Sequence, residues 1–235
     1  SFSASAMPLR PSTLRPDPIM DLEAVIGYSS DKPNNVLWSA DASIIAFPSN
    51  SIIVLMENTG SNEDSASSQN RVPRQELLFG HTDDVCALAL SQGGGLLASA
   101  QQGKYPMIRL WRLERFGVGL ANGSPIKAHC VTILTAHASD LQTMDFSSDD
   151  RRLCVVGRDQ HRRVQLIVWD VTRASVSAGS STRSPTSGAP DPIVARQISE
   201  FPIERIKFSP YHPDRLVSCG RENIRFWRIR NGHLR

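Results

Sequence analysis

The sequence predicts an all-β fold, a β-propeller of four-stranded antiparallel blades, with about four blades in the 235 residues. Tryptophan ends three short apolar runs at a constant spacing of 58 residues, at Trp111, Trp169 and Trp227. Short β-branched and apolar runs alternate with clusters of Gly, Pro, Asn, Asp and Ser, which is typical of strands and turns. No window has a convincing 3.6-residue period, so we expect almost no helix.

Each repeat is predicted to hold the same order of four strands. The first repeat places Leu55 where the later repeats have tryptophan. The first three strands of the four repeats are predicted at 35–39, 44–47 and 52–57; 85–90, 96–99 and 107–111; 141–146, 153–156 and 164–169; and 203–208, 215–219 and 224–227. A further strand precedes each repeat, at 22–26, 75–79, 131–135 and 193–198. Repetition of such sheets around an axis protects their edges.

The domain organisation follows from composition. Residues 1–20 are predicted to be a disordered or extended segment, and residues 21–235 to form a partial propeller. Flexible insertions are predicted at 58–73, 114–129 and 172–192. All three fall between the third and fourth strands of a repeat, and such connections leave a propeller on one face. We therefore expect partners to use the opposite face, which carries the predicted turns at 80–84, 100–107, 136–140, 157–163 and 220–223.

Two dipeptide pairs carry a family resemblance. Gly80-His81 with Trp111-Arg112, and Ala136-His137 with Trp169-Asp170, resemble the Gly-His and Trp-Asp signature of WD repeats. In that family a His before the first strand, a Ser or Thr on the second, an Asp in the next turn and the Trp form a buried hydrogen-bonded set. The resemblance assigns these roles to His81, Ser99 and Trp111, to His137, Asp159 and Trp169, and to Ser218 and Trp227.

The repeats depart from this pattern in several places. The turn 101–106 offers no Asp, and Val155 or Val156 stands where the third repeat should have a hydroxyl. The fourth repeat has Glu222 in its turn and no His, and the first repeat has neither His nor Trp. The resemblance therefore predicts the fold more firmly than the hydrogen bonds.

A second resemblance is more specific. Ile26-Gly27-Tyr28, Ile45-Ala46-Phe47-Pro48 and Ser99-Ala100-Gln101 are similar to the opening blades of cytoskeletal WD proteins, the echinoderm microtubule-associated-protein-like family and its relatives in centrioles and cilia. In those proteins a run ending in Gln replaces the usual Asp turn. The resemblance implies a non-catalytic scaffold in the cytoplasm and cytoskeleton, at a centriole, basal body or cilium. The resemblance implies protein partners, with tubulin or microtubules as the candidates. The alternative is a general WD-repeat adaptor of a ubiquitin-ligase or trafficking complex.

The number of repeats raises the question of ring closure. WD propellers usually close with seven or eight blades, so four repeats correspond to about half a ring. Because the strand 22–26 comes first and the strand at 224–230 comes last, the first strand is predicted to complete the last blade of a closed ring. Either further blades finish the ring, or two copies pair as a homodimer.

Basic residues crowd one predicted turn. Residues 1–120 contain nine Lys and Arg and twelve Asp and Glu, a net charge of −3. Residues 121–235 contain seventeen Lys and Arg and eleven Asp and Glu, a net charge of +6. The candidate partner-binding residues in the basic half are Arg158, His161, Arg162, Arg163 and Arg221. They would form a positively charged binding surface for an acidic partner. Nucleic acid is a poor candidate, because no aromatic residues interleave the basic ones.

The sequence favours neither an enzyme nor a cofactor or metal site. The four cysteines are scattered without a CxxC pair, so ordinary thiols are expected. His81 and Ser99 are the types of a nucleophilic pair, but the repeat places them between packed strands. Residues 117–123 lack the glycine spacing of a phosphate loop. No run approaches the roughly 18 apolar residues of a membrane span, so no membrane partner is expected.

Overall fold

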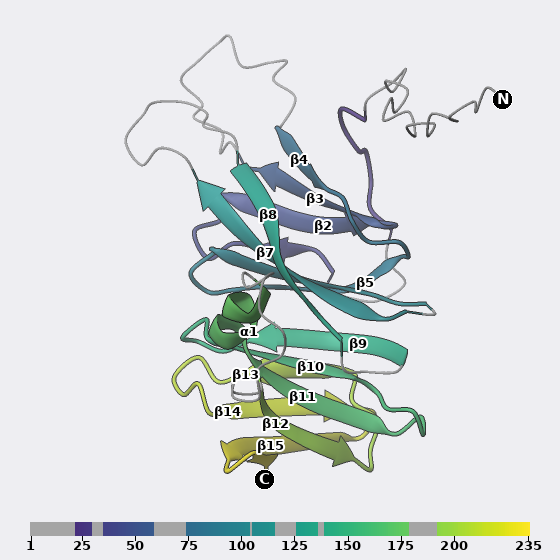
Figure 1. The fold of residues 1–235 in the computed structure, drawn as a ribbon, viewed down its shortest axis with the longest axis vertical. Coiled ribbons are helices and arrows are strands. Elements are labelled where there is room, and N and C mark those ends of the chain that lie inside the picture. Colours follow the sequence, from purple (N-terminus) through teal and green to yellow (C-terminus); the bar gives the residue numbers. More distant parts are fainter. Residues whose placement is uncertain are drawn as a thin grey trace, which may run out of the picture.

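The computed structural model describes residues 22–29, 35–58, 74–103, 105–115, 126–135, 139–178 and 192–235. These residues form four antiparallel sheets, each of four strands consecutive in sequence, which confirms the predicted fold class (Figure 1). We call the sheets blades 1 to 4. Blade 1 contains β1 (Leu37–Trp38), β2 (Ile44–Ser49), β3 (Ile52–Glu57) and β4 (Gln75–Leu78). Blade 2 contains β5 (Val85–Leu90), β6 (Leu96–Gln101), β7 (Met107–Arg115) and β8 (Ile126–Leu134).

Blades 3 and 4 repeat the same order. Blade 3 contains β9 (Ser139–Phe146), β10 (Arg152–Arg158), β11 (Val164–Asp170) and β12 (Ile193–Ser199). Blade 4 contains β13 (Arg205–Phe208), β14 (Arg215–Gly220), β15 (Asn223–Arg230) and β16 (His233–Leu234). The blades follow one another in sequence order, with blades 1 and 4 at opposite ends (Figure 1). The sheets do not close into a ring, so the fold is a partial propeller.

The core consists of three apolar layers between neighbouring blades. Trp111 packs in the layer between blades 1 and 2, Trp169 in the layer between blades 2 and 3, and Trp227 in the layer between blades 3 and 4. Each of these three tryptophans thus faces the preceding blade and is 4–8% exposed. Because side chains alternate across a strand, blades 2 and 3 each supply one face to each of two layers, whereas blades 1 and 4 each supply a face to a single layer.

The first blade is shifted by one residue from the predicted alignment. Ile53 pairs with Leu78 in blade 1, as Ile108 pairs with Leu134 in blade 2. Leu55 packs into the layer between blades 1 and 2, on the face of its sheet opposite to the one that bears tryptophan in the later blades. Met56, and not Leu55, therefore takes the tryptophan position. A shift of one residue moves every side chain of a strand to the other face, so spacing alone could not fix this alignment.

The predicted strand at 22–26 is also wrong. These residues lie outside any sheet, held by the side chain of Gln75: the Val25 N–H donates to Gln75 Oε1 at 2.8 Å, and Gln75 Nε2 donates to the Val25 carbonyl at 3.0 Å. Blade 4 has a fourth strand of its own, because Leu234 of β16 pairs with Ile229 of β15. The first strand is therefore not needed to complete the blade that ends this chain.

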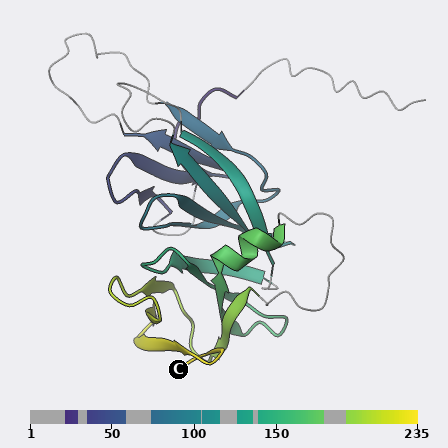
Figure 2. The same cartoon turned by 60° about the vertical axis from the view of Figure 1, so that its left-hand side comes forward.

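Ordered structure extends into two of the predicted insertions. β7 and β8 pair as far as Arg115 and Ile126, so strand residues occupy both ends of the segment 114–129. A helix, α1 (Val171–Ala178), occupies the start of the segment 172–192 and packs Val171 and Ala174 into the layer between blades 2 and 3 (Figure 2). Asp170 begins the helix as its N-cap, because its Oδ1 accepts the N–H groups of the second and third following residues at 3.1 Å. Eight residues are too few to show a helical period in the sequence.

None of the helical structure in the described ranges is both long and apolar enough to cross a membrane.

Candidate interaction face

One face of the propeller, which we call the open face, carries the loops that join one blade to the next and the loops between second and third strands. The described residues of the predicted turns 80–84, 100–107, 157–163 and 220–223 lie in such loops or at the strand ends beside them. Two features of this region matter for function: the polar set that fixes the loops of blade 2, and the charged groups around the axis.

The polar set of blade 2 is complete, with Gln101 as its fourth member. His81 Nε2 lies 2.6 Å from Ser99 Oγ, and Trp111 Nε1 donates to the same oxygen at 2.8 Å. His81 Nδ1 lies 2.9 Å from Gln101 Oε1. Gln101 Nε2 donates to Thr82 Oγ1 and to the Tyr105 carbonyl, at 3.1 and 3.0 Å. Gln101 therefore does what the missing Asp would do and also ties two loops of the open face together.

Burial keeps His81 neutral. Its side chain is 7% exposed, and desolvation, helped by the positive charge of Arg109, lowers its pKa to about 4 although the hydrogen bond with Gln101 acts in the opposite direction. In the neutral form Nδ1 donates to Gln101 and Nε2 accepts from the Ser99 hydroxyl, which in turn accepts from Trp111. The His81–Ser99 pair is thus a satisfied structural element in the interior.

The third blade lacks this set. His137 lies outside the described residues. Val155 is fully buried at the place of Ser99, and Trp169 Nε1 is buried with no hydrogen-bond partner among the residues described. Asp159 makes its hydrogen bonds within its own loop, where Oδ1 accepts the N–H groups of His161 and Arg163, each at 2.8 Å. The unpaired indole follows directly from a valine where blades 2 and 4 have serine.

The fourth blade keeps half of the set. Trp227 Nε1 donates to Ser218 Oγ at 2.8 Å, as the resemblance implies. Glu222 is an exposed turn residue with a φ of 63°. In place of the histidine, the loop that enters the blade passes Pro202 close to Gly220: a Cβ on this glycine would lie 2.0 Å from the Pro202 carbonyl oxygen. Backbone contact thus replaces side-chain hydrogen bonds here.

The structure brings the predicted basic residues of blade 3 together, but two of the three arginines are paired with carboxylates. Arg158 Nε lies 3.2 Å from Asp140 Oδ2, and its Nη1 donates to the Arg162 carbonyl at 2.8 Å. Arg163 pairs with Asp159 at 2.8 Å. Among the described residues, the guanidinium groups of Arg162 and Arg221 make no ion pair, and both residues are exposed. The net positive charge at this turn is smaller than the sequence indicates.

Polar contacts link neighbouring blades along their first strands, β1, β5, β9 and β13, which we call the inner strands. Asn35 Nδ2 donates to the Cys86 carbonyl at 3.1 Å, between blades 1 and 2. Between blades 3 and 4, the carboxylate of Asp145 accepts from Lys207 Nζ and from the Phe208 N–H, each at 2.7 Å. Burial raises the pKa of Asp145, although the ammonium of Lys207 acts against this effect. These contacts link blade 1 to blade 2 and blade 3 to blade 4 along their inner strands.

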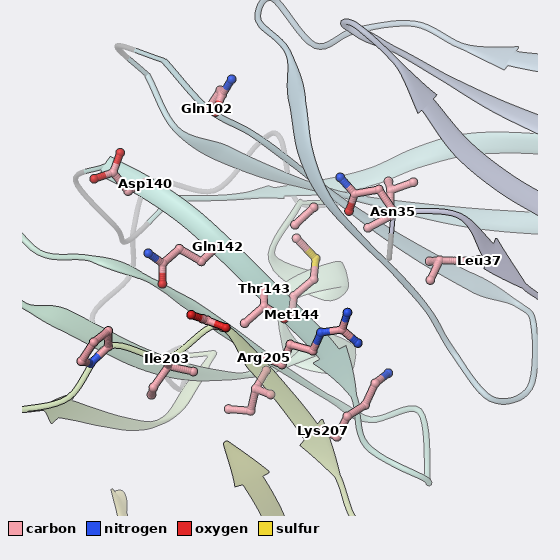
Figure 3. A pocket seen from close by; sticks show the side chains of 15 residues that line it. Asn35, Leu37, Gln102, Asp140, Gln142, Thr143, Met144, Ile203, Arg205 and Lys207 are labelled. Atoms are coloured by element: carbon pink, nitrogen blue, oxygen red, sulfur yellow. The ribbon is translucent and has the colours of Figure 1, made fainter. Parts of the chain in front are cut away.

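A cavity of about 620 Å³ lies between these inner strands. Its lining includes Gln102, Asp140, Gln142 and Glu204, and also Arg205 and Lys207. Figure 3 shows Asp140 and Gln142 toward one side of the cavity and Lys207 toward the other. Gln142 Oε1 is buried and accepts no hydrogen bond among the described residues. No pattern in the sequence pointed to Gln142 or Glu204, because only the ring geometry brings strands of different blades to one axis.

The cysteines show no metal arrangement. Among the described residues, no group of three His, Cys, Asp or Glu side chains is placed to hold a metal ion. Cys86 and Cys154 are buried, and burial raises the pKa of the Cys154 thiol far above its ordinary value. Cys130 is exposed and Cys219 is half-buried.

The repeat match and the blades define the class of this chain. The family described as "WD domain, G-beta repeat" matches residues 72–112 and 128–161. Together with the four-stranded sheets and the Trp–Ser contacts, this makes the chain a WD-repeat β-propeller.

Particular relatives extend the match to nearly the whole chain. It is 31% identical over 223 residues to WD repeat-containing protein 90 of Xenopus tropicalis, and 33% identical over 226 residues to Centriole proteome protein 16 of Chlamydomonas reinhardtii. Each alignment covers 94% of this chain and 10% of the relative. Cilia- and flagella-associated protein 52 of C. reinhardtii is 28% identical over 209 residues, which are 88% of this chain and 27% of that protein. The chain thus spans about a tenth of the length of the first two relatives, and the resemblance to centriolar and ciliary WD-repeat proteins is confirmed.

Proposed function

We propose that this chain is a non-catalytic, protein-binding scaffold and a microtubule-associated structural component of a centriole or cilium. The observation that carries the proposal is the similarity over 94% of the chain to a protein named Centriole proteome protein 16. A ciliary relative of different length shares most of the same region, which supports a role for this propeller segment itself. The corresponding location is the cytoskeleton at a centriole, basal body or cilium.

The geometry suits a scaffold. The groups that would attract attention as catalytic, His81 and Ser99, are buried and engaged with each other. Arg162 and Arg221 remain exposed on the open face, where a partner reaches them without unfolding a blade. Tubulin tails are acidic, and exposed guanidinium groups attract carboxylates over about one Debye length.

Reversing these two charges is expected to weaken microtubule binding. In the full-length protein, Arg162→Glu with Arg221→Glu should raise the Kd for taxol-stabilised microtubules about tenfold, because each change replaces attraction by repulsion. Co-sedimentation at graded tubulin concentrations measures this Kd. Arg162 and Arg221 are preferable to Arg158 and Arg163, whose replacement would also break the ion pairs with Asp140 and Asp159.

The matched control is Arg112→Glu with Arg151→Glu, two exposed arginines away from the turns 157–163 and 220–223. This variant should bind like the wild type. Removal of the tubulin tails with subtilisin should weaken microtubule binding by the wild-type protein as much as the charge reversal does. If the full-length protein does not co-sediment at all, the microtubule proposal is wrong. The alternative, a general WD-repeat adaptor of another complex such as a ubiquitin ligase or trafficking assembly, then becomes the better reading.

The open flank of blade 4 favours one further partner, a second copy of this chain. Ile224 and Phe226 point away from the core and are 67% and 82% exposed on a sheet face that none of the four described blades covers. We propose that two copies of the chain can pair through such flanks. Sedimentation equilibrium should then give twice the monomer mass of 25.9 kDa, and Phe226→Asp should restore the monomer. A wild-type chain that stays monomeric would rule the pairing out.

A further inference from the structure

We infer that residues 22–25 of one copy of the chain form a strand on the outer edge of β15 in a second copy. This inference rests on the proposed pairing of two copies, and it names the segment that joins them. Residues 22–25 lie beside blade 1, because Gln75 of β4 holds Val25. Blades 1 and 4 are at opposite ends of the fold, so a second copy has to supply the edge of β15 (Figure 1).

The first argument is an internal repeat. Residues 22–28, Leu-Glu-Ala-Val-Ile-Gly-Tyr, align without a gap to residues 75–81, Gln-Glu-Leu-Leu-Phe-Gly-His. The second of these segments begins with β4, the fourth strand of blade 1. The two equivalent glycines both have a positive φ, 92° at Gly27 and 138° at Gly80. Residues 22–25 therefore have the sequence of a fourth strand, although no described strand of the same copy pairs with them.

The second argument is the contact that takes the place of a sheet partner. The side-chain amide of Gln75 accepts the Val25 N–H at 2.8 Å and donates to the Val25 carbonyl at 3.0 Å. A residue of a neighbouring antiparallel strand offers the same two groups, one N–H and one carbonyl. Leu22 and Ile26 remain exposed, so this contact buries little apolar surface. A strand would replace the amide of Gln75 and add hydrogen bonds along the rest of the segment.

The third argument is the open edge of β15. β16 pairs only with Ile229 and Arg230, and Arg235 exchanges two backbone hydrogen bonds with Arg228, at 2.6 and 3.0 Å. In the parts of the chain that the structure describes, no strand covers the outer edge at positions 224–227. Because the outward backbone groups alternate along a strand, every second residue of this edge presents an N–H and a carbonyl to a further strand.

The register follows from the other blades. In blade 1, Leu78 of the fourth strand pairs with Ile53 of the third. Val25 aligns with Leu78 in the internal repeat. Ile224 stands three residues before the tryptophan of blade 4, as the residue equivalent to Ile53 does in blade 2. Placing Val25 opposite Ile224 sets the four residues of the segment against the four open positions of β15.

Charge favours the same pairing. Residues 22–58 contain one Lys or Arg and four Asp or Glu, a net charge of −3, whereas residues 203–235 contain eight and three, a net charge of +5. In the inferred register Glu23 lies opposite Phe226 and diagonal to Arg228, where oppositely charged side chains attract. Attraction therefore brings blade 1 of one copy to blade 4 of the other. Two such contacts, made reciprocally, close a two-fold dimer.

Disulfide cross-linking between two variants tests the inference. One variant carries Ala24→Cys and the other Arg225→Cys, and both carry Cys130→Ser to remove an exposed thiol. The register places positions 24 and 225 directly opposite, with Cα atoms about 4.5–5.5 Å apart, which a disulfide spans. Mild oxidation of the mixture should give a linked dimer on a non-reducing gel, and each variant alone should give none.

The matched control replaces Arg225→Cys by Arg230→Cys. Arg230 is exposed on the same strand, but His233 of β16 occupies the position opposite to it. The control mixture should therefore give no linked dimer. Equal cross-linking of the two mixtures, or no cross-linking in the first, would overturn the inference.

Sedimentation equilibrium of further variants measures the strength of the pairing. Val25→Pro should raise the Kd of the dimer about tenfold, because proline lacks the N–H that pairs with Ile224. Tyr28→Ala, outside the paired residues, should leave the Kd unchanged. Gln75→Ala should lower the Kd about threefold, since it removes the internal competitor for Val25.

The outcomes separate this inference from the proposals on which it rests. A wild-type dimer whose Kd is unchanged by Val25→Pro rejects the strand alone and leaves the pairing through the flank of blade 4 intact. A wild-type chain that stays monomeric rejects both. The centriolar role is tested separately, by microtubule co-sedimentation of the full-length protein with Val25→Pro, which leaves Arg162 and Arg221 in place.

Discussion

Acidification from pH 6.5 to pH 4 is expected to lower the free energy of unfolding by about 3 kcal/mol through one residue, His81. In the folded chain its pKa is lowered from 6.5 to about 4, chiefly by burial. Between these two values the unfolded chain binds a proton that the folded chain does not. Stability is therefore complete above pH 6.5 and is lost as the pH falls toward 4.

Urea unfolding followed by tryptophan fluorescence at several pH values measures this slope. His81→Asn should be less stable at pH 7, because it loses the contact with Ser99 or Gln101, but its stability should fall much less between pH 6.5 and 4. His161→Asn, at an exposed histidine, should keep the wild-type slope. A wild-type slope in His81→Asn would show that the histidine is not held neutral.

The carboxylates whose pKa values are shifted act outside this window or against it. Burial alone would raise the pKa values of Asp159 and Asp170, but hydrogen bonds from neighbouring groups hold them below 3.8, so their contribution is lost only at lower pH. Burial raises the pKa of Asp145, so its protonation on acidification favours the folded chain and offsets part of the loss.

Gly220→Ala should destabilise the chain by about 3 kcal/mol, at the upper end of the usual cost of overpacking. The added Cβ would lie 2.0 Å from the carbonyl oxygen of Pro202 and 3.0 Å from its carbonyl carbon. Both atoms belong to backbone, so neither side-chain rotation nor a small shift relieves the contact. The loop must move, and Ile203, which is 1% exposed in the layer between blades 3 and 4, moves with it.

Gly95→Ala is the matched control for this substitution. Nothing lies within 4 Å of a Cβ at Gly95, in the turn before β6 of blade 2. Its free energy of unfolding in urea should change by less than about 1 kcal/mol, with a gain if the unfolded chain loses freedom. A Gly220→Ala chain as stable as this control would contradict the close backbone contact.

The strands and their order were predictable because hydrophobic alternation and turn residues are local signals. The tryptophan spacing fixed blades 2 to 4, and the run Ser99-Ala100-Gln101 marked the residue that takes the place of the missing Asp. The alignment of blade 1 was missed because Leu55 and Met56 are both apolar, and only packing decides which of them faces blade 2. Helix α1 was missed because its signal lies in one capping Asp.

The charged sites were harder to predict, since they depend on contacts between distant strands. The sequence brought Arg158 and Arg163 into one cluster but could not show that Asp140 and Asp159 neutralise them. The axial cavity was not predicted at all, because Gln142 and Glu204 lie 62 positions apart on different blades. Residues of different blades that come together only in the folded propeller form no local sequence motif.

The shifted alignment of blade 1 gives its outward face a distinct kind of surface. In blades 2 and 4 a tryptophan N–H bonded to a serine fixes the packed face by direction as well as by shape. Blade 1 has Met56 and Phe47 at the corresponding places, so shape and apolar area alone determine what fits there. Both hydrogen bonds lie within a blade and hold the indole in one orientation, whereas a methionine side chain has several rotamers and adapts to the surface that it meets. The chain therefore combines two blades whose tryptophan is held by a hydrogen bond with one blade whose corresponding face is adaptable.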